Sequence, residues 1–389
     1  MIDLLNRSLD KVYLYCKDQN WAGYDPFDGL NSHIFQKLPF FNEKKIFRLI
    51  FLQINKKSPF NLRPLLMVPK DKNPKGIGLF LQATLNLHRR IQKPDYLETI
   101  RTFIGWLNDN AAPGYSGKCW GYNFDWQNRT FFLPEGTPTV VNTSFIGRAF
   151  INAYEALGET ELLEIARSSC GFILKDLNQI RKNGSLGFSY SPLDHYFINN
   201  ATALASSLLG MVYSKTRETE LAEAAKQSAL FVIAHQQNNG SWNYGEDQIG
   251  LKVGIDNFHT GFILESLKIY SETTGDEDYI EKIKKGLQFY QDNFFLKNGA
   301  PKYFYNKIYP LDIHSAAQSI ITLVQLKKYG SDMRLCQKII NWMVANMEDE
   351  EGYFYYQKNR FFTIKIPYIR WAQAWAFLAL TEYLNQNAD

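Results

Sequence analysis

Gly240-Ser-Trp-Asn-Tyr244 is one of four short stretches in which a glycine is followed by aromatic residues. The other three are Gly184-Ser-Leu-Gly-Phe-Ser-Tyr190, Gly299-Ala-Pro-Lys-Tyr-Phe-Tyr305 and Gly352-Tyr-Phe-Tyr-Tyr356, and their first glycines follow one another at 56, 59 and 53 residues. Glycine readily adopts the left-handed backbone conformation that ends a helix, and alternating aromatic residues suit a short strand pair. The spacing therefore predicts a structural repeat, and repeats decide the architecture of a chain.

Each glycine stretch separates two predicted helices of different character. The helices before the glycines are amphipathic and carry charged faces, and we expect them at 160–177, 219–235, 278–294 and 332–347. The helices after the glycines are poor in charge, and we expect them at 201–212, 260–267, 315–326 and 371–383. Because a helix that is apolar nearly all round is buried on both sides, the charge-poor helices form an inner layer and the amphipathic helices an outer layer.

One outer and one inner helix per repeat predict an all-α fold, an α/α toroid of six or seven helical hairpins. The first 110 residues contain weaker copies, with outer helices at 44–53 and 95–108, an inner helix at 76–90, and Asp28-Gly29-Leu30-Asn31 as the opening of a further inner helix. The aromatic loops, with short β-hairpins, all emerge at one end of the barrel. We expect residues 1–389 to form a single domain.

Composition excludes several classes of protein. The 389 residues are 45% hydrophobic and 21% charged, which is enough apolar material to exclude disorder as the main state. The formal net charge of +4 comes without a basic run, which argues against nucleic-acid binding. The N-terminus does not resemble a signal peptide, and no stretch is apolar enough to span a bilayer. Four dispersed cysteines suit a reducing compartment, so we expect a cytoplasmic protein.

The Gly-Ser-Trp-x-Tyr turn, followed by an inner helix that opens with Asp or Asn, resembles the α/α toroid superfamily. That superfamily includes six-hairpin glycosidases, unsaturated glucuronyl hydrolases, polysaccharide lyases and glucuronyl C5-epimerases. The opening stretch from Gly23 to Asn31 also resembles bacterial proteins encoded with surface-polysaccharide genes. The resemblance implies the toroid architecture and a connection with carbohydrates, and it assigns no reaction.

The densest group of candidate ligand-binding residues lies between Cys119 and Arg129. It brings Trp120, Asp125, Trp126 and Arg129 within ten residues of one another. Exposed indole rings offer flat apolar faces for sugar rings, so we expect Trp120, Trp126 and Trp242 to bind substrate by stacking and Arg129 to bind an anionic group. The alternative for each aromatic residue is that it packs under its neighbours and caps the barrel.

Carboxyl groups are candidates for acid/base chemistry. Asp256 and Asp312 occupy equivalent positions in adjacent repeats, and we expect them to be catalytic together with Asp125, which lies in an aromatic loop. Glycoside hydrolysis usually needs two carboxyl groups about 5–10 Å apart. Asp256 and Asp312 also precede helices, where Asp serves as an N-cap, so capping is their alternative role. Further acidic candidates are Asp194, Glu246 and Asp247.

Three of the six histidines lie at or just before predicted inner helices. We expect His259 and His314 to be catalytic by proton transfer and His195 to bind substrate. A lyase or C5-epimerase removes the proton beside a sugar carboxylate and needs polar or cationic groups to neutralise that carboxylate. Residues of suitable type at the mouth, which we expect to bind substrate, are Asn142, Asn200, Tyr244, Tyr368 and Arg370. No zinc-ligand spacing accompanies the histidines, so no metal or other cofactor is expected.

The sequence therefore predicts an enzyme that acts on a bacterial glycan or oligosaccharide containing uronic acid. Hydrolysis, elimination and epimerisation all remain open. Because no export signal is recognised, we expect a cytoplasmic role, in polysaccharide biosynthesis or on imported fragments. The first alternative is a non-catalytic toroid that binds a glycan or a partner glycosyltransferase of an assembly system. The second is processing of a lipid or isoprenoid, which the polar loops disfavour. No nucleic-acid partner and no transmembrane segment are expected.

Overall fold

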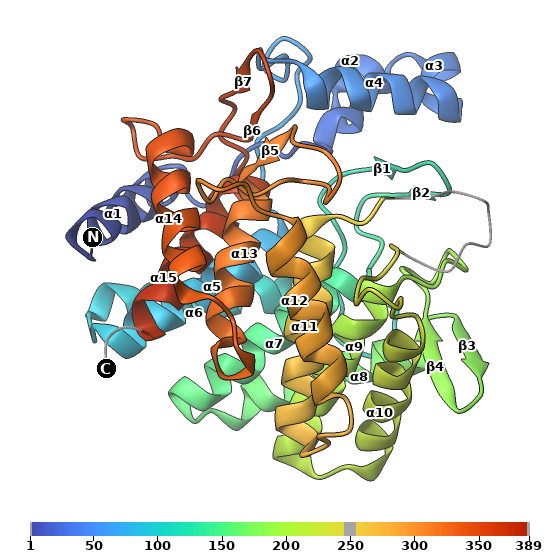
Figure 1. Ribbon diagram of the computed structural model, residues 1–389. Coiled ribbons are helices and arrows are strands. Elements are labelled where there is room, and N and C mark those ends of the chain that lie inside the picture. The colour runs from blue at the N-terminus through green and yellow to red at the C-terminus, as the bar shows by residue number, and fades with distance from the viewer. Residues whose placement is uncertain (1, 245–253, 387–389) are drawn as a thin grey trace.

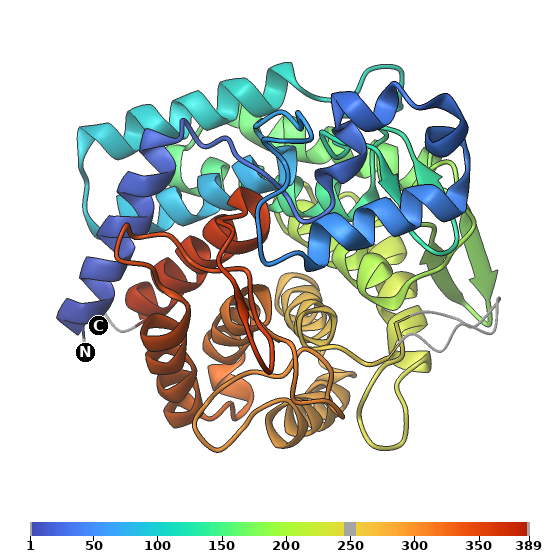
Figure 2. The ribbon, with the colours of Figure 1, turned by 90° about the horizontal axis from the view of Figure 1, so that it is seen from above.

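Six helices form a closed inner ring in the computed structural model, which describes residues 2–244 and 254–386. Each inner helix packs against the next, and the last packs against the first, as Figure 2 shows from above. The inner helices are α5 (Pro74–Arg90), α7 (Val140–Leu157), α9 (Asn199–Thr216), α11 (Asn257–Thr274), α13 (Ile313–Gln325) and α15 (Trp375–Gln386), which continues the π-helical turn η3 (Ile369–Ala374).

A second layer of helices surrounds this ring (Figure 1). The outer helices are α1 (Ile2–Asp18), α6 (Pro94–Asp109), α8 (Thr160–Lys175), α10 (Thr219–Ala234), α12 (Ile280–Asn293) and α14 (Met333–Met347). Each outer helix buries one side only, whereas α7 is buried without interruption from Val140 to Ile151. The predicted α/α toroid is confirmed, with buried charge-poor helices inside and amphipathic helices outside.

Three of the four predicted glycine turns repeat the same backbone geometry. The grouping of Gly184 with them was wrong, because Gly184 lies in the turn between the paired strands at 179–182 and 185–188, where a Cβ would meet no atom within 4 Å. Gly240, Gly299 and Gly352 have φ angles of 92°, 88° and 92°, in the left-handed region that favours glycine. Each glycine N–H donates to the carbonyl three residues earlier, at 2.9, 2.9 and 3.0 Å. A Cβ at each position would collide with the following outer helix, namely α12, α14 and α1 respectively. The N-terminal helix α1 is therefore the outer helix that follows α14 and closes the ring.

Short strands lie at one end of the barrel, the end at which the inner helices begin. The pairs are β1 (Trp126–Gln127) with β2 (Phe132–Leu133), β3 (Gln179–Lys182) with β4 (Ser185–Phe188), and the three-stranded set β5 (Leu311–Asp312), β6 (Gln357–Lys358) and β7 (Thr363–Ile364). We call this end the mouth. Among the described residues, no helix is both long and apolar enough to cross a membrane.

The first 70 residues depart from the predicted repeat. Asp28–Asn31 forms the 3-10 turn η1 and opens no inner helix. The helix predicted at 44–53 is α4 (Lys45–Lys57), which with α2 (His33–Gln36) and α3 (Pro39–Glu43) lies at the mouth end and outside the ring (Figures 1 and 2). The outer position is held instead by α1, which packs against α15. Amphipathicity identified α4 as a helix and could not tell which surface it covers.

Candidate functional site

The inner helices present their first turns to the mouth, and polar side chains cap them. Asp256 caps α11 by accepting a hydrogen bond from the His259 N–H at 2.9 Å. Asp312 caps α13 by accepting from the His314 N–H at 2.8 Å. The capping role that the sequence left open for both aspartates is therefore present, and each uses its second oxygen for another partner.

That second oxygen joins Asp256 to the His259 ring. Asp256 Oδ2 lies 2.6 Å from His259 Nδ1. Because a carboxylate only accepts hydrogen bonds, the proton between them belongs to Nδ1. In the neutral form of the ring this tautomer makes Nε2 the proton acceptor. The His259 side chain is 23% exposed, whereas that of Asp256 is 5% exposed. A covered carboxylate thus orients an accessible imidazole.

His259 lines a small recess at the start of α11. The recess has a volume of about 10 Å³ and is also lined by Asn200, Tyr244 and Asp256. The Tyr244 and His259 rings meet edge to face, with centroids 4.7 Å apart. Asn200 Oδ1 is buried and has no hydrogen-bond partner among the described residues. Four predicted site residues from three parts of the chain are therefore adjacent here.

His314 lies deeper than His259. It is 1% exposed and stacked between Phe258 and Trp375, with ring centroids 4.5 and 4.4 Å away. Neither ring nitrogen has a hydrogen-bond partner within the described ranges. Burial, followed by the nearby Lys75 and Arg370 charges, holds the pKa of His314 well below its usual range. This imidazole is therefore neutral and forms part of the floor of the mouth.

Asp312 is also enclosed. Its carboxylate accepts hydrogen bonds from Gln357 Nε2 at 2.6 Å and from Trp371 Nε1 at 3.1 Å. Burial raises the pKa of Asp312 to about 6, against the opposing effect of these hydrogen bonds and of the Lys56 charge. With the His314 N–H of its cap included, three protein donors hold this carboxylate in place.

Lys56 brings a positive charge to the mouth from α4. Its Nζ lies 4.2 Å from the centroid of the Phe27 ring and 5.8 Å from that of Trp371. Burial lowers the pKa of Lys56 to about 8, although Asp312 and Asp25 act in the opposite direction. An ammonium over an aromatic platform can bind an anionic group of a ligand.

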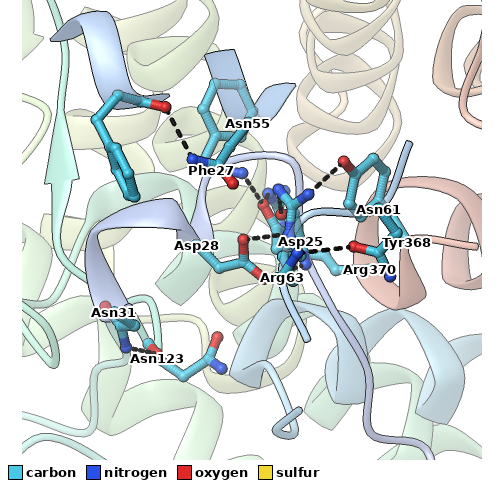
Figure 3. A network of polar contacts seen from close by, with 11 residues as sticks. Asp25, Phe27, Asp28, Asn31, Asn55, Asn61, Arg63, Asn123, Tyr368 and Arg370 are labelled. Carbon is cyan, nitrogen blue, oxygen red and sulfur yellow. Dashed lines mark hydrogen bonds and ion pairs between the residues drawn. The ribbon is translucent and has the colours of Figure 1, made fainter. Parts of the chain in front are cut away.

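A network of ion pairs fastens the loop at 25–31 to the last inner helix (Figure 3). Arg370 donates two parallel hydrogen bonds to the Asp25 carboxylate, at 2.7 and 2.8 Å. Arg63 donates to Asp28 at 2.6 Å and to the Tyr368 hydroxyl at 2.8 Å. Tyr368 and Arg370, which we expected to bind substrate, thus lie at the mouth with their polar groups engaged by protein.

The aromatic cluster of the sequence divides into two groups. Trp126 is half-buried and meets the Phe27, Tyr122 and Tyr190 rings at the mouth, with centroids 6.2, 6.0 and 5.6 Å away. Trp120 and Trp242 are 0% and 2% exposed, and their indole N–H groups donate to backbone carbonyls at 2.8 and 2.9 Å. The packing alternative applies to these two tryptophans, because neither has a free face for a sugar ring.

The remaining candidates lie at several depths. Asp125 Oδ1 accepts a hydrogen bond from the Glu135 N–H at 2.8 Å, so Asp125 stabilises its own loop. Asp194 stabilises its loop in the same way, by accepting from the Ser191 and Tyr196 N–H groups.

The other candidates differ in exposure. Arg129 and His195 are exposed. Asn142 is fully buried in α7, and its amide atoms have no hydrogen-bond partner in the described part of the chain. Glu246 and Asp247 lie outside the described residues.

Sequence reasoning missed several residues that the fold brings to the mouth. Lys56 reaches it from a helix assigned to the outer layer, and Asp25 from a stretch quoted only for its resemblance. Lys75 follows the capping residue Asn73 by two positions, and its Nζ lies 4.5 Å from the Phe145 ring. The sequence did indicate where Lys75 lies, because Asn73-Pro74-Lys75 has the N-cap and the proline that are typical of the start of a helix. Within residues 2–244 and 254–386, no cluster of three or more His, Cys, Asp or Glu could hold a metal ion.

Comparison with solved structures identifies the fold. The chain superposes on a sugar epimerase from a ruminal bacterium with a TM-score of 0.64 and 14% identity, over 83% of this chain and 91% of that chain. Cellobiose 2-epimerase from Bacillus thermoamylovorans gives 0.62 and 13%, over 80% and 88%. The GH76 α-mannanase BT2949 of Bacteroides thetaiotaomicron gives 0.62 and 13%, over 82% and 88%. At such identities the likeness establishes the α/α toroid fold alone.

Comparisons of the sequence with known proteins do not assign the chain to a family within this fold. No protein-family model matches the chain, and no curated protein matches it in sequence.

Proposed function

We propose that this chain is an enzyme that moves a proton on a saccharide, with His259 as the general acid/base and Asp256 as its positioning residue. The observation that carries the proposal is the contact of 2.6 Å between Asp256 Oδ2 and His259 Nδ1 at the mouth. It leaves Nε2 of an accessible imidazole ready to accept a proton, which is how a carboxylate prepares histidine for acid/base work.

The carboxyl groups favour proton transfer over hydrolysis. Glycoside hydrolysis needs one carboxyl group to protonate the leaving oxygen and another to act as nucleophile or base. Asp312, Asp194 and Asp125 each accept hydrogen bonds from nearby protein N–H groups, and Asp256 is committed to His259. Compared with Asp312, Asp194 and Asp256, the His259 imidazole is the more accessible proton acceptor.

Lys56 supports a saccharide that carries a carboxylate, as in a uronic acid. Its ammonium lies over Phe27 beside the mouth and can neutralise the negative charge that develops when the proton next to a carboxylate is removed. His259 would take that proton. Return of a proton from water to the opposite face, with release of the abstracted proton from His259 to solvent, gives the epimer. Departure of the glycosidic oxygen on the neighbouring carbon, protonated by His259, gives an unsaturated sugar. A role in polysaccharide biosynthesis belongs to the same proposal.

The experiment incubates the protein in D2O with a panel of glucuronate-containing and neutral oligosaccharides and follows them by NMR. Deuterium beside the carboxylate together with a new epimer indicates epimerisation, and absorbance of an unsaturated sugar indicates elimination. The variant His259→Asn should abolish turnover while the far-ultraviolet circular dichroism stays unchanged. New reducing ends without exchange or unsaturation would contradict the proposal. Saccharide binding without turnover, unchanged in His259→Asn, would instead favour the non-catalytic toroid.

A further inference from the structure

The surface of α2–α4 and the loop that follows it is unusually apolar. Of the nineteen large apolar side chains that are exposed in the described residues, ten lie between Ile34 and Met67. On α4 they fall on one face, at Ile46, Ile50 and Ile54, which are 59%, 47% and 54% exposed. Side chains four residues apart lie above one another on a helix, so these three form a continuous stripe.

The same segment is strongly basic. Residues 33–70 contain eight Lys and Arg residues and a single acidic residue, Glu43, which gives a net charge of +7. The entire chain has a net charge of +4, so the rest of it is net negative. Lys44, Lys45 and Lys57 are exposed and flank the apolar stripe at the two ends of α4.

The inward face of α4 fixes the direction in which this surface points. Lys56 lies over Phe27 and Trp371, and Arg48 donates to Gln127 Oε1 at 2.9 Å and stacks over Phe132. These contacts hold α4 against the mouth end of the barrel (Figures 1 and 2). Arg48 and Lys56 each follow an isoleucine of the stripe by two positions, which on a helix places the isoleucines on the opposite side, away from the barrel.

A second apolar projection lies at the same end of the molecule. The turn between β6 and β7 carries Arg360, Phe361 and Phe362, and the two phenylalanines are 85% and 45% exposed. Figure 1 places β6 and β7 at the same end as α2–α4.

We propose that the outer face of α2–α4 is a docking surface for an anionic lipid membrane. A helix with an apolar face flanked by lysines lies in the interface of a bilayer, where the apolar side chains enter the headgroup region and the basic ones contact negative lipids. Docking in this way turns the mouth of the barrel toward the membrane. The surface is separate from the Asp256–His259 pair, so it does not depend on the proposed reaction.

The charge argues against a second copy of the chain as the occupant. A symmetric dimer through this face would bring the exposed lysines of one copy, Lys37, Lys44, Lys45 and Lys57, against those of the other, and like charges facing each other across an interface weaken it. An anionic surface instead gains from every lysine that approaches it.

The test measures sedimentation of the full chain with vesicles of phosphatidylcholine alone and of phosphatidylcholine with phosphatidylglycerol. Binding is expected only to the anionic vesicles and should fall as salt is raised, because salt screens the attraction. The variant Ile46→Ser/Ile50→Ser/Ile54→Ser should lower the partition coefficient by at least about tenfold. Its control is Leu14→Ser/Ile91→Ser/Leu193→Ser, which removes similarly exposed side chains elsewhere and should bind like the parent.

A second pair of variants tests the charge. Lys44→Gln/Lys45→Gln/Lys57→Gln should also weaken binding by at least about tenfold, since a lysine near an anionic surface contributes on the order of fivefold. Lys282→Gln/Lys284→Gln/Lys285→Gln, on exposed positions of α12, should not. Equal binding of parent and isoleucine variant, no binding to anionic vesicles at low salt, or a dimer in light scattering that the isoleucine variant dissolves would each overturn the proposal.

Discussion

The Asp256 carboxylate contacts His259 at two points: Oδ1 accepts a hydrogen bond from the His259 backbone N–H at 2.9 Å, and Oδ2 lies 2.6 Å from His259 Nδ1. One side chain thus both begins α11 and orients the imidazole, and two substitutions separate these roles. Asn is as good an N-cap as Asp and carries no charge, whereas Ala can neither cap nor orient.

We therefore expect Asp256→Asn to unfold in urea with nearly the parent free energy, and Asp256→Ala to lose about 1 kcal/mol. Both variants should lower saccharide turnover, on the order of 10²–10⁴-fold, if the carboxylate holds the histidine tautomer. An Asp256→Asn variant with parental turnover would mean that the aspartate is only a cap.

Asp312 makes stability depend on pH in a definite direction. Burial raises its pKa from 3.8 to about 6 in the folded chain, so between these values the folded state binds a proton that the unfolded state has released. The free energy of unfolding should consequently be highest for this group below pH about 4 and should fall by up to about 3 kcal/mol as the pH rises through 6.

The measurement compares urea unfolding of the parent and of Asp312→Asn at pH 4 and pH 7. The parent should lose more stability over this interval than the variant, which cannot ionise at position 312. Asp28, whose pKa burial also raises to about 6, is present in both proteins and cancels in the difference. An identical pH dependence of the two proteins would show that Asp312 does not titrate in this range.

Gly352 closes the ring against α1, and Gly330 offers a matched control. Their φ angles are 92° and 94°, so Ala at either position meets the same left-handed strain of roughly 1–2 kcal/mol. A Cβ at 352 would also lie 2.7 Å from the Lys11 Cβ and 3.0 Å from its carbonyl oxygen, whereas a Cβ at 330 has no atom within 4 Å. Gly352→Ala should therefore lose about 1–3 kcal/mol more than Gly330→Ala in thermal or urea unfolding. Equal losses would show that α1 moves aside easily.

Three of the four repeats were predictable because their glycines meet the same physical requirement, which Gly184 does not share. Gly240, Gly299 and Gly352 all need positive φ and close approach to the next outer helix, so the glycine and its spacing survive in the sequence. The position of α4 was predicted wrongly, because this helix carries apolar residues on two faces. Leu52 is buried, whereas Ile50 is exposed. Periodicity reports that a helix forms, and it does not report which surface the helix covers.

The candidate site was predictable only in part, for a similar reason. Asp256, His259 and Asn200 lie at the start of inner helices and Tyr244 ends a glycine turn, and such positions converge at the mouth. The depth of a side chain depends on its neighbours in space. Trp126 lies among mouth residues, whereas Trp120, six residues earlier, packs into the wall on Phe150 with centroids 5.9 Å apart.

The buried pair of Arg370 with Asp25 should contribute far more to stability than an exposed pair of the same kind. Arg370 and Asp25 are 3% and 5% exposed and share two hydrogen bonds. Arg370→Met leaves the Asp25 charge buried without its partner, and this should lower the free energy of unfolding by about 3–5 kcal/mol.

The exposed pair of Arg101 with Glu159 is the control. Arg101 and Glu159 also form a bidentate pair, but their side chains are 48% and 39% exposed, so Arg101→Met should lower the free energy of unfolding by at most about 1 kcal/mol. The double variant Asp25→Asn/Arg370→Met removes both charges and should be more stable than Arg370→Met alone, because no unpaired charge remains buried. If Arg370→Met and Arg101→Met proved equally stable in urea unfolding, the loop at 25–31 would not be fastened to the last inner helix by this pair.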